Sequence, residues 1–185
     1  LWNLIWKLKC PNKIKQFMWR SCRDILPTKH RLRARGIHIE DDCEQRGMCE
    51  SAGHVLWGCK LAAEVWGASR LKMPAIPNQT QDFLDLVWEI RERKPGIDWE
   101  TFAVTAWSLW NHRNALKHGG QRKDAGRIIK EVAKYVKEFR QENLCLKEPS
   151  KSPKSHWSPS RCGRYKINMD GAVFKESGSC GVGVV

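Results

Sequence analysis

A cluster of three cysteines and one histidine between residues 43 and 59 constrains this chain more than any other feature. The spacing is Cys43-x5-Cys49-x4-His54-x4-Cys59. Thiolate and imidazole groups are common zinc ligands, usually four around one ion. Ser51 is a suitable N-cap for a helix that begins near Ala52, and this helix would carry the last two members of the cluster. The sequence therefore predicts a Cys3His zinc site, with buried, metal-free thiols as the alternative.

One position departs from the common spacing of zinc ligands. Tight zinc turns usually open with Cys-x2-Cys, but the residue three positions after Cys43 is Arg46, which cannot ligate a cation. Counted from the other end, Cys49-x4-His54-x4-Cys59 has the back half of a zinc-knuckle spacing and lacks the same ligand. Cys43 and Cys49 can therefore serve together only if the loop between them is flexible enough to bring both thiols to the ion.

The charge distribution indicates a polyanionic partner. The chain has 33 Lys and Arg against 20 Asp and Glu, a net charge of +13. Residues 1–36 contain ten of the basic residues and one acid, Asp24, which is a net +9. A basic segment of this kind is the electrostatic footprint of nucleic-acid binding, and the interleaved tryptophans favour that interpretation. A solvated basic surface without a ligand is the alternative.

Six basic side chains are the predicted phosphate contacts. They fall on two short helices expected at residues 11–22 and 28–35, the second capped by Thr28 and closed by Gly36. The six are Lys13, Lys15, Arg20, Arg31, Arg33 and Arg35. Such contacts would hold RNA, DNA or a hybrid of the two, but they carry no base-specific information.

Apolar periodicity near 3.6 residues predicts a mainly α fold. Further helices are expected at residues 61–69, 80–94, 98–118 and 124–146, with Thr80 and Asp98 starting the second and third. Trp88 belongs to the apolar set expected to face the core. His112 and His118 are interpreted as surface or capping residues, because no carboxylate or cysteine is spaced to use them.

The composition changes near residue 148. Residues 148–163 are rich in Lys, Ser and Pro, which predicts a flexible linker too polar to bury a core. Beyond it the apolar period becomes two, which predicts strands at 164–174 and 181–185 and thus a truncated β-hairpin. The expected organisation is a small helical domain of the zinc-binding type at 1–117, a C-terminal helix at 118–147, the linker at 148–163, and the hairpin fragment at 164–185.

Several short motifs, in their order and spacing, resemble a known family. From residue 1 to about residue 117 the chain resembles the zinc-binding region that follows reverse transcriptase in plant non-LTR retrotransposons of the LINE type. The motifs include Ile5-Trp6-Lys7-Leu8-Lys9-Cys10-Pro11, Phe17-Met18-Trp19-Arg20, Ile25-Leu26-Pro27-Thr28, Glu50-Ser51, His54-Val55-Leu56-Trp57 and Trp110-Asn111-His112-Arg113-Asn114. The resemblance implies zinc ligands at Cys43, position 46, His54 and Cys59. Because position 46 is Arg46, Cys49 is the one local replacement.

The last 22 residues resemble the opening of a type 1 ribonuclease H domain, which has an α/β fold. The motifs are Asn168-Met169-Asp170-Gly171-Ala172 and Gly181-Val182-Gly183-Val184-Val185. The resemblance implies that Asp170 is a catalytic carboxylate that binds a divalent ion; a simple turn signal is the alternative. A two-metal hydrolase needs several carboxylates, and we expect the later ones beyond residue 185. Mg²⁺ is therefore expected only in a complete domain, and this chain alone is expected to be inactive.

Two functions from different classes follow. The first is a nucleic-acid-binding fragment of a retrotransposon reverse transcriptase polyprotein. The second is part of an RNA:DNA hybrid ribonuclease, and a non-functional transposon remnant is a further alternative that Arg46 favours. The resembled polyproteins combine an RNA-directed DNA polymerase with that ribonuclease, so whether this chain is itself an enzyme is left open.

The remaining sequence features bear on location. No stretch approaches the roughly 18 apolar residues of a membrane span, and no signal peptide precedes residue 1. Eight scattered cysteines in a basic chain do not suggest a disulfide framework. We therefore expect an intracellular, non-secreted protein of the nucleus or cytoplasm with no membrane partner, cut from a longer polyprotein, whose protein partners the sequence does not name.

Overall fold

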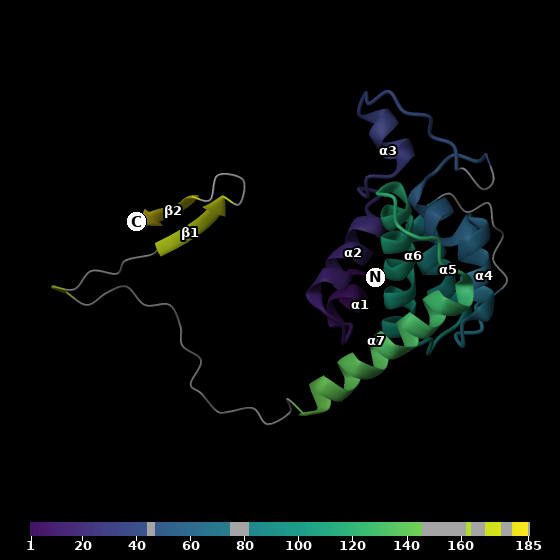
Figure 1. The fold of residues 1–185 in the computed structure, drawn as a ribbon. Coiled ribbons are helices and arrows are strands. Elements are labelled where there is room, and N and C mark those ends of the chain that lie inside the picture. The colour runs from purple at the N-terminus through teal and green to yellow at the C-terminus, as the bar shows by residue number, and fades with distance from the viewer. Residues whose placement is uncertain (44–46, 75–81, 146–161, 164–168, 175–178, 185) are drawn as a thin grey trace. The chain divides into compact units, whose positions relative to one another are not determined.

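The computed structural model describes residues 1–43, 47–74, 82–145, 162–163, 169–174 and 179–184. The chain divides into two compact units, Leu1–Leu146 and Lys147–Val185. The first unit is helical, which confirms the prediction of a mainly α fold (Figure 1). Its helices are α1 (Trp2–Lys7), α2 (Asn12–Cys22), α3 (Lys29–Ala34), the π-helix η1 (His54–Gly58), α4 (Lys60–Ala68), α5 (Phe83–Arg93), α6 (Trp99–Lys117) and α7 (Ala125–Cys145).

Helix α6 lies at the centre of the helical unit. It packs against α2, η1 and α7, while α4 contacts η1 and α7 (Figure 1). Apolar side chains surround α6 on several faces, as expected of a helix buried in a core. Phe102 is fully buried and stacks on Trp66 of α4 at a centroid distance of 5.0 Å and on Phe83 of α5 at 6.3 Å. One aromatic side chain therefore joins three helices.

Local signals in the sequence set several of the helix ends. The Thr28 hydroxyl accepts a hydrogen bond from the backbone N–H of Arg31, and the Asp98 carboxylate accepts one from Thr101, which confirms both predicted N-caps. Gly36 has φ +83°, a conformation that glycine adopts without steric cost, just after α3. Thr80, the predicted start of the next helix, lies outside the described residues.

The apolar stripe of α5 differs from the prediction at one residue. The core-facing residues of this helix are Phe83, Leu86, Val87 and Ile90. Trp88 is instead 41% exposed, and its ring lies 5.1 Å from the guanidinium carbon of Arg91. The prediction that Trp88 faces the core is therefore wrong. A stripe at positions i, i+3, i+4 and i+7 excludes the residue next to i+4, which points about 100° away.

The second unit contains two antiparallel strands, β1 (Met169–Phe174) and β2 (Ser179–Val184). In their register Asp170 pairs with Gly183, and Gly171 pairs with Val182. The predicted hairpin is therefore present, with β1 beginning at residue 169 in the described chain. Residues 148–161 of the predicted linker and residues 164–168 of the predicted first strand lie outside the described residues.

Candidate metal centre

A turn of π-helix brings His54 and Cys59 together. The Ser51 hydroxyl accepts a hydrogen bond from the His54 N–H at 3.1 Å, which confirms the predicted cap. Residues 54–58 then form η1, and the Cys59 N–H donates to the His54 carbonyl at 2.7 Å. In an α-helix, residues five apart point about 140° away from each other. The i to i+5 hydrogen bond of a π-turn aligns them instead, so both side chains reach the same site.

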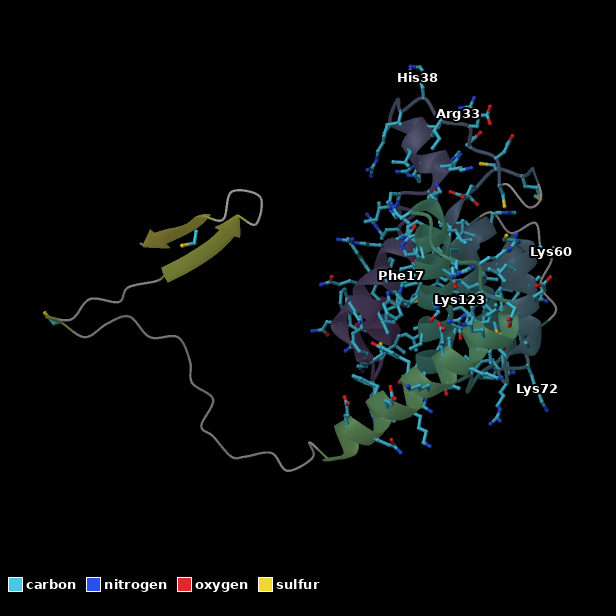
Figure 2. All side chains as sticks on the ribbon, viewed as in Figure 1. Phe17, Arg33, His38, Lys60, Lys72 and Lys123 are labelled. Atoms are coloured by element: carbon cyan, nitrogen blue, oxygen red, sulfur yellow. The ribbon has the colours of Figure 1, made fainter. Side chains whose placement is uncertain are left out.

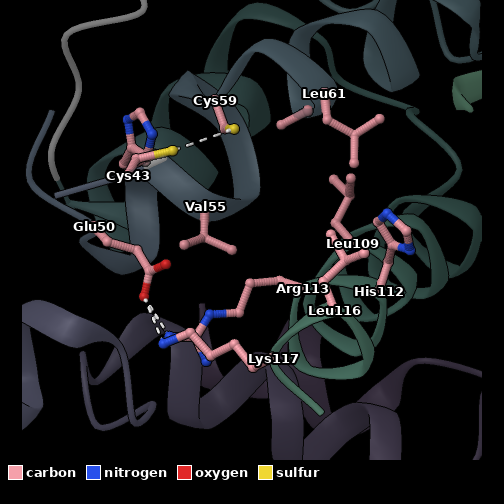
Figure 3. A pocket seen from close by; sticks show the side chains of 12 residues that line it. Cys43, Glu50, Val55, Cys59, Leu61, Leu109, His112, Arg113, Leu116 and Lys117 are labelled. Atoms are coloured by element: carbon pink, nitrogen blue, oxygen red, sulfur yellow. Dashed lines mark hydrogen bonds and ion pairs between the residues drawn. The ribbon is translucent and has the colours of Figure 1, made fainter. Parts of the chain in front are cut away.

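Cys43 completes a group of three side chains. One ligand atom from each of Cys43, His54 and Cys59 lies within 4.8 Å of the others, and the two Sγ atoms are 3.8 Å apart (Figure 3). Two thiolates bound about 2.3 Å from one tetrahedral zinc ion would be about 3.8 Å apart as well. Two sulfurs and one ring nitrogen at this spacing fit a zinc ion.

Backbone hydrogen bonds hold Cys43 in place. Its N–H donates to the Met48 carbonyl at 2.7 Å, and its carbonyl accepts from the Gly47 N–H at 2.7 Å. Gly47 has φ +60°, a left-handed conformation that glycine adopts without steric cost. These two hydrogen bonds connect the backbone of Cys43 to that of the residues just before Cys49. Arg46 lies outside the described residues.

The side chains of Cys43, His54 and Cys59 are largely shielded from solvent. Cys43 and His54 are buried, and Cys59 is partly buried. Burial, followed by the neighbouring Cys43 thiol, raises the pKa of Cys59. A bound cation would favour the thiolates, because metal binding to cysteine releases the thiol proton.

A cavity of about 90 Å³ adjoins the group and extends to α6 (Figure 3). At its edge the buried Glu50 carboxylate pairs with the Arg113 guanidinium and accepts the Lys29 N–H at 3.0 Å. Lys117 Nζ lies 3.6 Å from the same oxygen. Burial alone would raise the pKa of Glu50, but these hydrogen bonds and charges hold it below its usual range. Glu50 therefore links residues 41–59, called here the cysteine segment, to α3 and to α6.

Sequence reasoning missed the roles of Glu50 and Arg113. Both belong to motifs that carry the family resemblance, but they are 63 residues apart, and no local pattern pairs them. The interpretation of His112 as a surface or capping residue is wrong, since its side chain is 5% exposed. Neither of its ring nitrogens has a hydrogen-bond partner among the described residues. Burial, with the charges of Lys123 and Arg122, lowers the pKa of His112.

His112 is buried because tertiary packing covers its face of α6. It borders the cavity beside the metal group and a second cavity lined from α6 and α7. Figure 3 shows it across the first cavity from the two cysteines. His118, by contrast, is exposed and is the C-cap residue of α6, as predicted.

Cys49, the fourth predicted ligand, lies in a different group. It is exposed, and its Sγ is 3.3 Å from His30 Nδ1 and 3.8 Å from Asp41 Oδ2. The structure therefore brings together three of the four predicted zinc ligands and places the fourth beside α3. Residues 42 and 49 pair as an isolated antiparallel bridge, which fixes the position of Cys49 in the backbone.

Two other cysteines, Cys10 and Cys22, are buried outside any described ligand group and serve as a comparison. None of the cysteines whose side chains the structure describes forms a disulfide. Cys10 and Cys22 lie in the apolar core, where burial raises their pKa values to about 11 and about 12. Neither is part of a ligand group among the described residues. Convergence with His54, rather than burial, distinguishes Cys43 and Cys59.

The predicted phosphate contacts on α2 differ in their surroundings. Lys13 Nζ lies 4.8 Å from the centroid of the Trp107 ring, and Lys15 Nζ donates to the Trp6 carbonyl at 3.2 Å. Arg20 is exposed at the end of the helix. Two of these three cations are therefore anchored on the protein, while Arg20 projects into solvent.

The predicted contacts on α3 are also divided between paired and solvent-facing groups. Arg31 Nε lies 3.7 Å from an oxygen of Asp24, and Arg33 Nη1 lies 2.7 Å from Asp41 Oδ1. Arg33 nevertheless remains 64% exposed, and Arg35 is exposed at the helix end. Figure 2 shows Arg33 and His38 at the α3 end of the helical unit. This short helix thus presents basic groups to solvent next to the cysteine segment.

Comparisons with known proteins agree with this geometry. Residues 1–66, which include the cysteine group, match the family described as zinc-binding in reverse transcriptase. A protein of Arabidopsis thaliana with the provisional name ribonuclease H protein is 24% identical over 198 aligned positions, covering 99% of this chain and 31% of the relative. No solved structure matches the chain.

These two matches confirm the resemblance drawn from the sequence. Residues 1–66 are similar to the zinc-binding region of reverse transcriptases, and the chain as a whole is similar to part of a relative whose provisional name is ribonuclease H protein. It spans about a third of the length of the curated relative it matches. Among the described helices, none is both long and apolar enough to cross a membrane.

Proposed function

We propose that this chain is a nucleic-acid-binding fragment of a retrotransposon reverse transcriptase polyprotein, organised around a zinc centre. The convergence of Cys43, His54 and Cys59 within the segment that matches the zinc-binding family carries this proposal. These three residues would hold Zn²⁺, and the fourth position is left for Cys49, as predicted from the sequence, or for water. We infer that the protein acts inside the cell, in the nucleus or cytoplasm, where its thiols stay reduced.

The zinc ion would have a structural role, because it would connect segments of the helical unit. It would tie Cys43 to η1, and Glu50, seven residues after Cys43, contacts both the start of α3 and α6. Holding this segment in place would restrict the motion of α3. The exposed basic side chains of α3 would then be presented to a polyanion in a fixed arrangement. Rigid presentation lowers the entropy cost of binding, which is how a structural ion can support affinity without contacting the nucleic acid.

Nucleic-acid binding is supported by exposed arginine side chains that make no ion pair among the described residues. Arg20 and Arg35 are exposed, and no ion pair is recorded for them within the described residues. Such side chains can contact phosphates without breaking an internal interaction. Binding of this kind releases counterions, so the affinity should fall steeply with salt and depend little on base sequence.

The test is a salt titration of affinity for single-stranded RNA, duplex DNA and an RNA:DNA hybrid. The variants are Arg20→Gln and Arg35→Gln, and the control is Lys60→Gln, which removes an exposed charge at the first residue of α4 (Figure 2). Each true phosphate contact should lower the slope of log affinity against log salt by about 1. Affinity insensitive to salt, or equal losses in Lys60→Gln, would contradict the proposal.

A ribonuclease role is the second candidate, and the relative's provisional name favours it. Asp170 on β1 would be its first carboxylate, in a backbone position paired with Gly183. One carboxylate supplies a fraction of the oxygen ligands that Mg²⁺ needs, and the ion dehydrates reluctantly. We therefore infer that residues 1–185 alone do not cleave a hybrid.

A further inference from the structure

A second group of potential metal ligands lies beside α3, apart from the buried cysteine group. His30, Asp41 and Cys49 each place one ligand atom within 4.8 Å of the others. The distances are 3.3 Å from Cys49 Sγ to His30 Nδ1, 3.8 Å from Cys49 Sγ to Asp41 Oδ2, and 3.9 Å from His30 Nδ1 to Asp41 Oδ2. Ligands bound at about 2.0–2.3 Å around a tetrahedral ion are about 3.3–3.8 Å apart. The three atoms therefore form nearly one face of a zinc tetrahedron.

Backbone hydrogen bonds position the three ligands from separate segments. The His30 N–H donates to the Glu50 carbonyl at 3.4 Å, and the Glu50 N–H donates to the Asp41 carbonyl at 2.7 Å. Asp42 and Cys49 form the isolated bridge. Backbone hydrogen bonds thus join the start of α3 to residues 41–42 and 49–50 around this group.

Arg33 orients the carboxylate of the group. Its Nη1 donates to Asp41 Oδ1 at 2.7 Å, which leaves Oδ2 facing His30 and Cys49. Hydrogen bonding of a ligating carboxylate by a neighbouring group is a common feature of metal sites.

We propose that His30, Asp41 and Cys49 bind a second divalent ion of the zinc class, with water in the remaining position. The donor set contains one nitrogen, one oxygen and one sulfur, and a thiolate in the set disfavours Mg²⁺ and Ca²⁺. His30 and Cys49 are exposed, so an ion can reach the group from solvent. An ion at this site would hold the start of α3 against the cysteine segment, and Cys49 would bind this ion rather than the buried one.

The experiment is a Co²⁺ titration of the reduced, metal-free 185-residue chain, followed by displacement with Zn²⁺. Thiolate-to-cobalt absorption and bound-metal analysis give the number of ions. The wild type should bind two equivalents, and His30→Asn and Asp41→Asn should each bind one. His38→Asn is the matched control, because His38 is an exposed histidine on the same side of the molecule, and it should still bind two (Figure 2).

Variants of the buried group separate this proposal from the proposed zinc centre. Cys59→Ser should lose one equivalent and keep the one that His30→Asn removes. A wild-type chain that binds a single ion, lost in Cys49→Ser and unaffected by His30→Asn, would overturn the second site and place Cys49 in the first. If Cys59→Ser leaves the stoichiometry unchanged while His30→Asn lowers it, the first centre fails and the second stands. Circular dichroism checks that each variant keeps its helices.

Discussion

The two ligand groups share the cysteine segment but differ in their surroundings. Cys43, His54 and Cys59 all come from one stretch of seventeen residues and are largely covered by protein. His30, Asp41 and Cys49 come from three segments, and two of them are exposed. An ion in the buried group would stabilise the core that surrounds it, whereas an ion in the exposed group would fasten one short helix. Removing a ligand from either group should therefore reduce the number of bound ions by one, but the loss of folding stability should be larger for the buried group.

The largest expected effect separates the two groups by thermal unfolding in excess zinc. A ligand present at 1,000 times its dissociation constant stabilises the folded state by about 4 kcal/mol. Cys59→Ser should lose about this amount of zinc-dependent stabilisation, because it removes a sulfur from the largely covered group. Cys49→Ser should lose clearly less. Equal losses in the two variants would show that both thiols hold the same ion.

The next effect concerns the ion pair between the cysteine segment and α6. Arg113→Met leaves the buried Glu50 carboxylate without its main cation, and removing one partner of a buried pair costs about 3–5 kcal/mol. Lys117 at 3.6 Å should keep the loss near the lower limit, about 3 kcal/mol. Denaturant unfolding of the metal-free protein measures it.

The ion-pair prediction has a control on another surface. Lys134→Met breaks an exposed pair with Glu138 and should change the unfolding free energy by less than about 1 kcal/mol. A loss in Arg113→Met no greater than in this control would show that Glu50 does not depend on Arg113.

A smaller effect is expected from pH, far from either ligand group. Burial tends to raise the pKa of Asp98, but hydrogen bonds from Thr101 and Arg140 lower it below its usual range. A carboxyl with a lowered folded pKa stabilises the protein fully above its unfolded pKa, and this contribution is lost as the pH falls through the folded pKa. Asp98→Asn keeps a good helix cap and removes the charge. In metal-free protein it should cost under about 1 kcal/mol at pH 7, since the Arg140 pair is partly exposed.

The pH dependence supplies the check on this prediction. The difference in unfolding free energy between wild type and Asp98→Asn should shrink as the pH is lowered from about 5 towards 2, because the wild-type carboxyl becomes protonated. A difference that stays constant over this range would mean that the Asp98 charge is not the cause.

The last prediction concerns the hairpin, for which we expect no measurable ribonuclease activity. The two ligand groups each bring three donors together, whereas Asp170 is one carboxylate on β1. Incubation of the full chain with a labelled RNA:DNA hybrid and Mg²⁺ or Mn²⁺ should give no cleavage above that of Asp170→Asn. Cleavage that disappears in this variant would show that two chains assemble a shared site.

Several structural features of this protein could be predicted from the sequence because they depend on interactions between residues close together in the chain. The caps at Thr28 and Asp98, the helix of residues 12–22 and the hairpin each depend on residues within a few positions of one another. The cysteine cluster is local as well, so its ligands could be named from spacing. Short-range hydrogen bonds and apolar periodicity act in the same way in any tertiary context, which is why a sequence reveals them.

Other features of the site depend on contacts between residues that are far apart in the sequence. Spacing alone could not show that a π-turn aligns His54 with Cys59, or that Cys49 would face His30. Packing of α7 over α6 buried His112, and the Glu50 to Arg113 pair spans 63 residues. Such contacts depend on how whole helices pack, and packing is set by the summed fit of many side chains. Residue type and spacing were enough to name the side chains that could bind a metal ion, whereas helix packing set which of them lie close together.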